Sequence, residues 1–192
     1  RTVEAGAWPL GADSKDVLLF SDTFNSAFEP AIPRAALKVL QAAGYRVHAI
    51  EAQGRPLCCG RTYLSVGMVD EARAEIQRTV EALKPYIAAG VPVVGLEPAC
   101  LLTLRDEFHA VLPGADTQAL SDNAFLLEEF LARELDAGRL ALDLKPLPQS
   151  KALLHGHCHQ KSFGAVGSVQ QILALVPGLK TSLIDSSCCG MA

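Results

Sequence analysis

Short apolar runs alternate along the chain with segments in which apolar residues recur at helical spacing. Runs of the buried-strand type occupy 16–20, 45–50, 91–96, 151–156 and 180–185. The segments between them predict helices over 30–44, 68–89, 100–108, 123–138 and 165–176. The helical spacing is clearest over 68–89, where the apolar residues are Val69, Ala72, Ile76, Val80, Leu83 and Ile87. Strands that alternate with helices predict an α/β fold with parallel sheets.

The two parts of the chain follow the same order of elements. Each begins with an apolar strand, continues through a helix and a second strand, and reaches the triplet Cys-Cys-Gly, at 58–60 and at 188–190. We interpret this as two pseudo-repeated parallel α/β units of Rossmann-like type. The first repeat, with a following helix, covers 1–136, a proline-containing linker covers 137–150, and the second repeat covers 151–192. Ligands of such sheets bind at the carboxyl ends of strands, so the cysteine motifs are expected to converge there.

Composition narrows the classes of function. The net charge of −4 excludes the basic stripe of a nucleic-acid-binding surface. No apolar run in the sequence is long enough for a membrane span, so we expect a protein that is cytoplasmic, or peripheral at the cytoplasmic face of the membrane. The ends, "RTVEAGAWPL" and "DSSCCGMA", indicate a piece of a longer polypeptide, with the second repeat truncated.

Six cysteines supply the candidate chemistry: Cys58, Cys59, Cys100, Cys158, Cys188 and Cys189. Four of them form adjacent pairs, which rarely bridge each other because the geometry is strained. Reduced thiols that bind a metal or take part in redox chemistry are therefore expected. Thiolates select iron–sulfur clusters, zinc or copper(I), and adjacent cysteines suit the separate irons of a cluster better than one tetrahedral zinc. Gly60 and Gly190 follow the pairs and leave room for close approach.

These motifs resemble the cysteine-rich CCG domain of iron–sulfur oxidoreductases, a group that includes the B subunit of heterodisulfide reductase. The similarity is strongest to the C-terminal iron–sulfur part of FAD-linked D-lactate/glycolate dehydrogenases. It rests on the segments "LLFSDTFNSAFEP", "CCGRTYLSVGMVDEAR", "VVGLEPACLLTLRDEF", "HGHCHQK" and "DSSCCGMA". The family pattern is a lone cysteine, then Cys-Cys-Gly, then Cys-x-x-Cys, and it occurs twice.

The resemblance carries over to this chain position by position. In the second repeat, Cys158 matches the lone cysteine and the 188–189 pair matches the vicinal cysteines, while the closing pair would lie beyond residue 192. In the first repeat the 58–59 pair matches the vicinal cysteines. Asp22 stands where the family has its lone cysteine. Glu97 stands at the first cysteine of Cys-x-x-Cys, and Cys100 keeps the second. The carboxylate oxygens of Asp22 and Glu97 are then candidates to assist the three thiols, as metal ligands or as neighbours of the ligands. Because the first repeat departs from the family pattern in this way, we expect one cluster, held chiefly by the second repeat and the segment beyond residue 192.

The implied function is electron transfer, through a [4Fe-4S] cluster that the isolated piece can lack. FAD would belong to an upstream domain, and the electrons would pass to a quinone or a carrier protein. The chain is not expected to turn over a substrate by itself. Two alternatives stay open: a structural zinc-binding or subunit-assembly domain, and a thiol/disulfide redox protein.

Histidines and an arginine flank the cysteines. On an extended backbone His155, His157 and His159 would share one face, with Cys158 on the other. They are expected to donate hydrogen bonds around the site or to cap the next helix, with direct metal ligation as the alternative. Arg61 would neutralise the charge of a cluster, meet a substrate or quinone oxygen, or lie in solvent.

Overall fold

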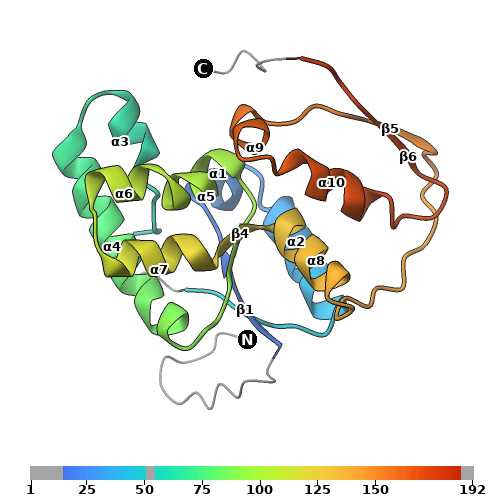
Figure 1. The fold of residues 1–192 in the computed structure, drawn as a ribbon, viewed down its shortest axis with the longest axis horizontal. Helices are drawn as coiled ribbons and strands as arrows, with labels where there is room; N and C mark the ends of the chain where they lie inside the picture. Colours follow the sequence, from blue (N-terminus) through green and yellow to red (C-terminus); the bar gives the residue numbers. More distant parts are fainter. Residues whose placement is uncertain (1–14, 51–54, 187–192) are drawn as a thin grey trace. The chain divides into compact units, whose positions relative to one another are not determined.

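The computed structural model describes residues 15–50 and 55–186, and the chain divides into two compact units, Arg1–Leu126 and Leu127–Ala192. Each unit has its own parallel sheet, of four strands in the first and two in the second (Figure 1). The mixed α/β class predicted from the sequence is confirmed.

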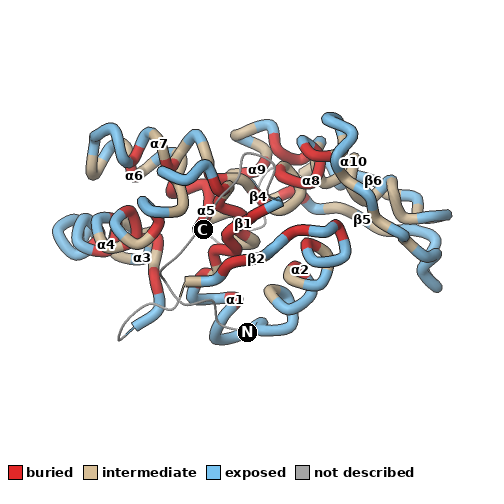
Figure 2. The backbone as a smooth tube through the Cα atoms, turned by 90° about the horizontal axis from the view of Figure 1, so that it is seen from below, coloured by how far each residue is buried: buried red, intermediate tan, exposed pale blue. Residues whose placement is uncertain are grey.

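The sheet of the first unit is formed by β1 (Asp16–Phe20), β2 (Arg46–His48), β3 (Val93–Gly95) and β4 (Ala124–Leu126), in the order β2-β1-β3-β4. All neighbours are parallel, and Phe20 pairs with Gly95, which pairs with Leu126. Three strands therefore end at the same level of the sheet. Every residue of the central strand β1 is buried, as expected for a parallel strand covered on both faces (Figure 2).

Seven helices of the described part of the first unit accompany this sheet. They are α1 (Thr23–Ala27), α2 (Ala31–Ala42), α3 (Arg61–Ser65), α4 (Val69–Ala88), α5 (Pro98–Arg105), α6 (Glu107–Val111) and α7 (Ala115–Asn123). Helix α4 confirms the predicted 68–89 helix, and four apolar residues of the predicted stripe are buried: Ala72, Ile76, Val80 and Leu83. Each large aliphatic side chain among them contributes ~1.5–3 kcal/mol by leaving water.

The prediction of one helix over 123–138 is wrong in its first residues. Residues 124–126 form β4, and the helix α8 (Leu127–Asp136) begins only after it. A short, fully buried apolar run has no periodicity that separates a strand from a helix, and pairing with β3 decides the outcome. The predicted helix over 100–108 is likewise divided at Asp106 into α5 and α6, and α7 was not predicted.

The second unit contains α8, β5 (Lys151–Leu154), α9 (Cys158–Ser162), α10 (Val166–Leu173) and β6 (Lys180–Leu183). Strands β5 and β6 pair in parallel, with Leu154 opposite Leu183. Helix α8 packs against α10, and the Gln171 amide donates to Asp136 at 2.6 Å. The segment 139–150 has neither helix nor strand. None of the helices in the described residues is both long and apolar enough to cross a membrane.

Candidate metal centre

Three thiols gather in the first unit. Cys58 and Cys59 directly precede Gly60, the N-cap of α3, and Cys100 is the third residue of α5. The thiol of Cys59 is hydrogen-bonded to those of both Cys58 and Cys100. Cys59 and Cys100 are buried and Cys58 is half-buried. The structure thus brings together three cysteines that lie on two separate segments of the sequence.

The surroundings raise the pKa values of the Cys58 and Cys59 thiols. The hydrogen bond with Cys59, followed by burial, raises the pKa of the Cys58 thiol far above its usual range. The hydrogen bond with Cys100 is the largest cause that raises the pKa of Cys59 to about 12, and burial adds to it. A metal must displace these protons before it can bind, which weakens its affinity at neutral pH. The Gly60 N–H donates to the Cys58 sulfur at 3.4 Å, and this bond offsets the rise in the pKa of Cys58 only in part.

The loop that carries the first cysteine pair is fixed against α4. Gly60 has a φ of +77°, and a Cβ at this position would lie 3.1 Å from the carbonyl oxygen of Ala72. The Thr79 hydroxyl donates to the Cys58 carbonyl at 2.9 Å. A side chain at position 60 would press on the backbone of α4, which cannot rotate away. The loop before α3 can therefore approach α4 this closely only with glycine at position 60.

Asp22 and Glu97, the carboxylates expected to assist the thiols, are helix caps. Each stands two residues beyond the paired strand ends Phe20 and Gly95. Asp22 is buried and accepts from the Asn25 backbone N–H at 2.9 Å and side-chain amide at 2.6 Å. Glu97 accepts from the Ala99 N–H at 3.3 Å. These bonds satisfy the first turns of α1 and α5.

The first unit does not fit an iron–sulfur cluster. Three thiols lie together there, while the carboxylates nearest to the missing cysteine positions are used as caps. Across residues 15–50 and 55–186, no group of three or more His, Cys, Asp or Glu side chains is arranged to hold a metal ion. No step of electron transfer is therefore assigned to the first unit.

Arg61 is paired within the first unit. Its guanidinium donates to the carboxylate of Glu107 and, at 3.4 Å, to the hydroxyl of Thr103. The Thr103 hydroxyl donates in turn to the Ala99 carbonyl at 2.7 Å. Arg61 thereby ties the turn after the Cys-Cys-Gly triplet to α5, which carries Cys100, and to α6.

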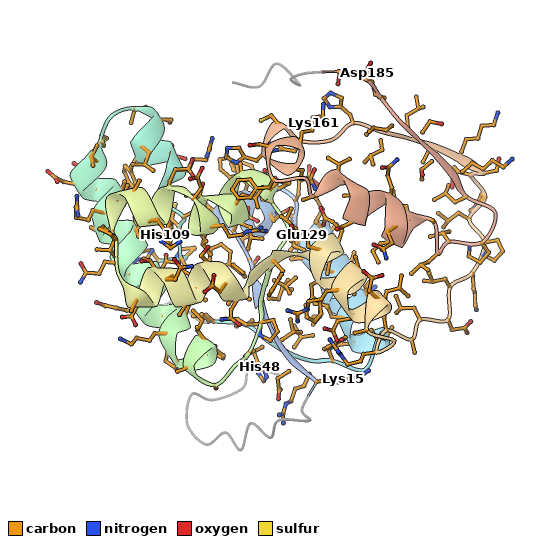
Figure 3. The ribbon with its side chains drawn as sticks, viewed as in Figure 1. Lys15, His48, His109, Glu129, Lys161 and Asp185 are labelled. Carbon is orange, nitrogen blue, oxygen red and sulfur yellow. The ribbon has the colours of Figure 1, made fainter. Side chains whose placement is uncertain are left out.

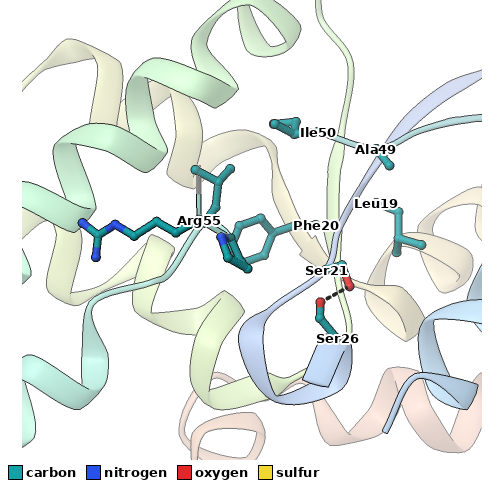
Figure 4. A pocket seen from close by; sticks show the side chains of 9 residues that line it. Leu19, Phe20, Ser21, Ser26, Ala49, Ile50 and Arg55 are labelled. Carbon is teal, nitrogen blue, oxygen red and sulfur yellow. Dashed lines mark hydrogen bonds between the residues drawn. The ribbon is translucent and has the colours of Figure 1, made fainter. Parts of the chain in front are cut away.

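A pocket of about 300 Å³ lies beyond the ends of β1 and β2. Its lining is mostly apolar and consists of Leu19, Phe20, Ser21, Ser26, Ala49, Ile50, Arg55, Pro56 and Leu57. Ser21 and Ser26 share a hydrogen bond of 2.8 Å, and the side chain of Arg55 extends away from the other lining residues (Figure 4). Its guanidinium pairs with the buried carboxylate of Glu75. The pocket brings together none of the predicted site residues.

The second unit places Cys158 as the first, exposed residue of α9. His157 is the N-cap: its Nδ1 accepts from the His159 N–H at 3.2 Å, and its own N–H donates to the Gln160 side chain at 3.1 Å. Helix α9 begins immediately after His157, so the extended alternation considered for 155–159 is wrong from Cys158 onward. Capping, one of the roles open to these histidines, is the role that His157 has.

His155 and His159 are placed differently from His157. His155 is exposed, and within the described residues the buried Nδ1 of His159 has no hydrogen-bond partner. The rings of His157 and His159 meet edge to face, with centroids 5.7 Å apart. Cys188, Cys189 and Gly190 lie outside the described residues, so the predicted ligands of the second repeat are represented here by Cys158.

Two interactions around α9 were not predicted. The Gln160 amide donates to Glu128 of α8, and Lys161 donates to Ser186, the last described residue. Burial raises the pKa of Glu128, and the bond from Gln160 offsets this shift only in part. The capping pattern His-x-x-Gln at 157–160 was a local signal for the start of α9, whereas both long-range bonds depend on tertiary packing.

Comparison with known proteins places almost the whole chain beside dehydrogenases. The chain is 34% identical to the C subunit of the anaerobic glycerol-3-phosphate dehydrogenase of Escherichia coli, over 94% of its own length and 45% of that protein. It is 25% identical to lactate utilization protein A of Bacillus velezensis, over 91% of this chain and 71% of that protein. It is also 25% identical to D-2-hydroxyglutarate dehydrogenase of Pantoea ananatis, over 93% of this chain and 16% of that protein.

The chain spans about half the length of the glycerol-3-phosphate dehydrogenase subunits that it matches. No family model matches the chain, and no solved structure matches it significantly. The sequence is therefore similar, nearly from end to end, to parts of dehydrogenases and of a lactate-utilisation protein.

Proposed function

We propose that this chain is the iron–sulfur, electron-transferring part of an FAD-linked 2-hydroxy-acid dehydrogenase of the D-lactate/glycolate type. The observation that carries the proposal is the similarity of more than nine-tenths of the chain to each of three relatives, one of them a dehydrogenase subunit. Lactate and 2-hydroxyglutarate, which appear in the names of two of these relatives, are both 2-hydroxy acids. The CCG-type cysteine pattern supplies the link to iron–sulfur chemistry.

The second unit is the proposed site of the cluster. Leu154 and Leu183 pair at the ends of β5 and β6, and both Cys158 and Cys188 follow within five residues. We therefore expect both cysteines near the end of this sheet at which the two strands finish. Cys158, Cys188 and Cys189 would supply three thiolates. Among the described cysteines Cys158 is exposed, whereas Cys59 and Cys100 are buried.

The proposed internal repeat has support from the local geometry of both units. Asp16 pairs with Arg46 in the first unit and Lys151 pairs with Lys180 in the second, so nearly equal lengths of chain separate the paired strands. A five-residue helix follows each first strand, and a polar N-cap precedes it in both units. The cap of the first repeat is Asp22, and the cap of the second is His157, next to Cys158.

Within the proposed protein, a bound [4Fe-4S] cluster would accept and release one electron at a time. The chain's own residues would hold one of these thiolates in place, because His157 and Gln160 fix the first turn of α9, where Cys158 lies. FAD would be bound by another domain or subunit, and a quinone or carrier protein would receive the electrons. We place this protein in the cytoplasm or at the cytoplasmic face of the membrane.

The test is to purify the protein without exposure to air and to measure iron, acid-labile sulfide and zinc per chain. The proposal expects about four irons and four sulfides, with a visible absorption band that dithionite bleaches. Bound zinc without a visible band would contradict the iron–sulfur proposal and favour a structural zinc-binding domain. Absence of any metal, together with reversible oxidation of the vicinal thiols, would contradict the iron–sulfur proposal and favour a thiol/disulfide redox protein.

A further inference from the structure

Large apolar side chains are exposed on the first unit where α1 is joined to α2. Phe24, Phe28 and Ile32 are 54%, 73% and 46% exposed, and we refer to these three residues as the α1–α2 patch. Every residue from 26 to 32 is exposed, and the tube is pale blue over this turn in Figure 2. Single exposed apolar residues are common on protein surfaces, whereas a group of this kind is typical of a place of contact.

The patch is held by hydrogen-bonded turns. The rings of Phe24 and Phe28 lie 6.3 Å apart with their planes tilted by 31°. The Phe28 N–H donates to the Phe24 carbonyl at 2.8 Å, and the Ile32 N–H donates to the Glu29 carbonyl at 2.9 Å. Because the backbone beneath the patch is already ordered, little conformational entropy is lost when a partner covers it.

The patch is also anchored to the core of the first unit. The buried strand β1 begins directly after Lys15, which Figure 3 labels, and α1 begins three residues after Phe20, the last residue of that strand. The buried carboxylate of Asp22 caps the first turn of α1. The patch is therefore part of the folded surface and not of a long loop.

Charges of opposite sign stand beside the patch. Glu29 directly follows Phe28, and Arg34 is the fourth residue of α2, two positions after Ile32. Both side chains are exposed, and within the described part of the chain neither of them forms an ion pair. A surface with an apolar centre, one acidic residue and one basic residue is complementary to itself. In two copies related by a twofold axis, each Glu29 can meet the Arg34 of the other copy.

This distribution of charge favours a second copy over a membrane as the occupant. Anionic membrane surfaces attract clusters of Lys and Arg. Here Glu29 adjoins Phe28, the most exposed residue of the patch, and an anionic surface that covered Phe28 would repel it. A second copy of the chain leaves both charges paired.

We propose that the α1–α2 patch is the interface of a homodimer of this chain, with Phe28 at its centre and the Glu29–Arg34 pairs at its rim. The interface is isologous, so both copies contribute the same residues. The inference concerns the first unit and goes beyond the proposed electron-transfer function, because none of the proposed cluster ligands takes part in it.

Sedimentation equilibrium of the metal-free, 192-residue chain over a range of concentrations measures the dissociation constant of the dimer. Phe28→Ser removes the central aromatic side chain. Glu29→Arg brings like charges together at both ends of the interface, and the double variant Glu29→Arg/Arg34→Glu exchanges the two charges and restores their pairing. Val66→Ser is the matched control, because Val66 is 66% exposed in the turn after α3 and lies outside the patch.

The unmodified chain and Val66→Ser are expected to dimerise with the same dissociation constant. Phe28→Ser should raise this constant about thirtyfold or more, as loss of a central aromatic residue does. Glu29→Arg should raise it about tenfold or more through like-charge repulsion, and the double variant should return it close to that of the unmodified chain. Circular dichroism identifies a variant that fails to fold, and Phe24→Ser then takes the place of Phe28→Ser.

A chain that stays monomeric at every concentration would overturn the inference. A dimer that Phe28→Ser leaves intact, or that Val66→Ser weakens equally, would also overturn it. Failure of the double variant to restore the dimer would contradict the reciprocal Glu29–Arg34 contacts and the twofold arrangement built on them. A dimer of a chain that never binds iron would leave the interface standing and remove the iron–sulfur proposal, and iron bound by a monomer would do the reverse.

Discussion

Replacement of Gly60 by alanine tests how closely the Cys-Cys-Gly loop of the first unit approaches α4. Two separate costs arise at this position. The residue has a φ of +77°, in the left-handed region, and a Cβ would lie 3.1 Å from the Ala72 carbonyl oxygen and 3.5 Å from the Ile76 side chain. Gly67 provides a matched control, because its φ is +78° and a Cβ there would meet nothing within 4 Å.

The magnitudes of the two effects separate the variants. A left-handed backbone costs a non-glycine residue ~1–2 kcal/mol, and the reduced freedom of the unfolded chain returns ~0.4–1 kcal/mol. Gly67→Ala should therefore lower the free energy of unfolding by about 1 kcal/mol or less. Gly60→Ala carries the same cost together with over-packing of ~1–3 kcal/mol, since the nearest atom belongs to a helix backbone and cannot rotate away.

Urea unfolding followed by circular dichroism measures both variants against the unmodified chain. Gly60→Ala is expected to lose about 2–4 kcal/mol in total, and the difference between the two variants isolates the contact with α4. If Gly67→Ala is as destabilised as Gly60→Ala, the close approach of the loop and helix described above does not exist in solution.

Three further outcomes are expected. Asp22→Ala should cost about 1–2 kcal/mol in urea unfolding, while Asp22→Asn should stay near the unmodified chain because asparagine also caps helices; equal losses would contradict the capping role. The pKa of Glu128 is raised in the folded state above the ordinary pKa of 4.5. The protonated carboxyl group therefore contributes its full stabilisation at pH values below 4.5, and this contribution is lost as the pH rises through the folded-state pKa. Glu128→Gln should thus be more stable than the unmodified chain at pH 7 and converge with it near pH 4, and a constant difference across that range would refute the shift. In metal-free folded protein at pH 8, iodoacetamide should modify the exposed Cys158 well before the buried Cys59, whose pKa is raised to about 12; mass spectrometry of peptides gives the order, and early modification of Cys59 would show that the thiol cluster is open.

The sequence predicted the elements whose pattern is local. Helix α4 has a long stripe of apolar residues at helical spacing, and β1 is an apolar run bounded by polar residues, so both follow from short-range information. Strand β4 does not, because Ala124, Phe125 and Leu126 continue without a break into the apolar face of α8. Only the pairing with β3 makes these three residues a strand.

The candidate site shows the same division between local and long-range information. Cysteine type and spacing indicated soft-metal chemistry, and the structure brings Cys59 to Cys100 within the first unit. The convergence of the cysteine motifs of both repeats stays a prediction. The role of Glu97 as a cap could have been inferred from its place just before the predicted helix over 100–108, whereas α1, the helix that Asp22 caps, was not predicted. The contact between Lys161 and Ser186 could not have been inferred, because it joins residues 25 positions apart and no local pattern encodes it.

The most direct test of this account compares iron binding in two single-cysteine variants, Cys158→Ser and Cys100→Ser, both purified without air. The account places the cluster in the second unit, because the second repeat keeps the lone cysteine and the vicinal pair of the family pattern, whereas Asp22 and Glu97 stand at cysteine positions of the first. Cys158→Ser should therefore lose the iron and the visible band, while Cys100→Ser should retain about as much of both as the unmodified protein. Loss of iron in Cys100→Ser with retention in Cys158→Ser would contradict the assignment and place the cluster at the thiols of the first unit.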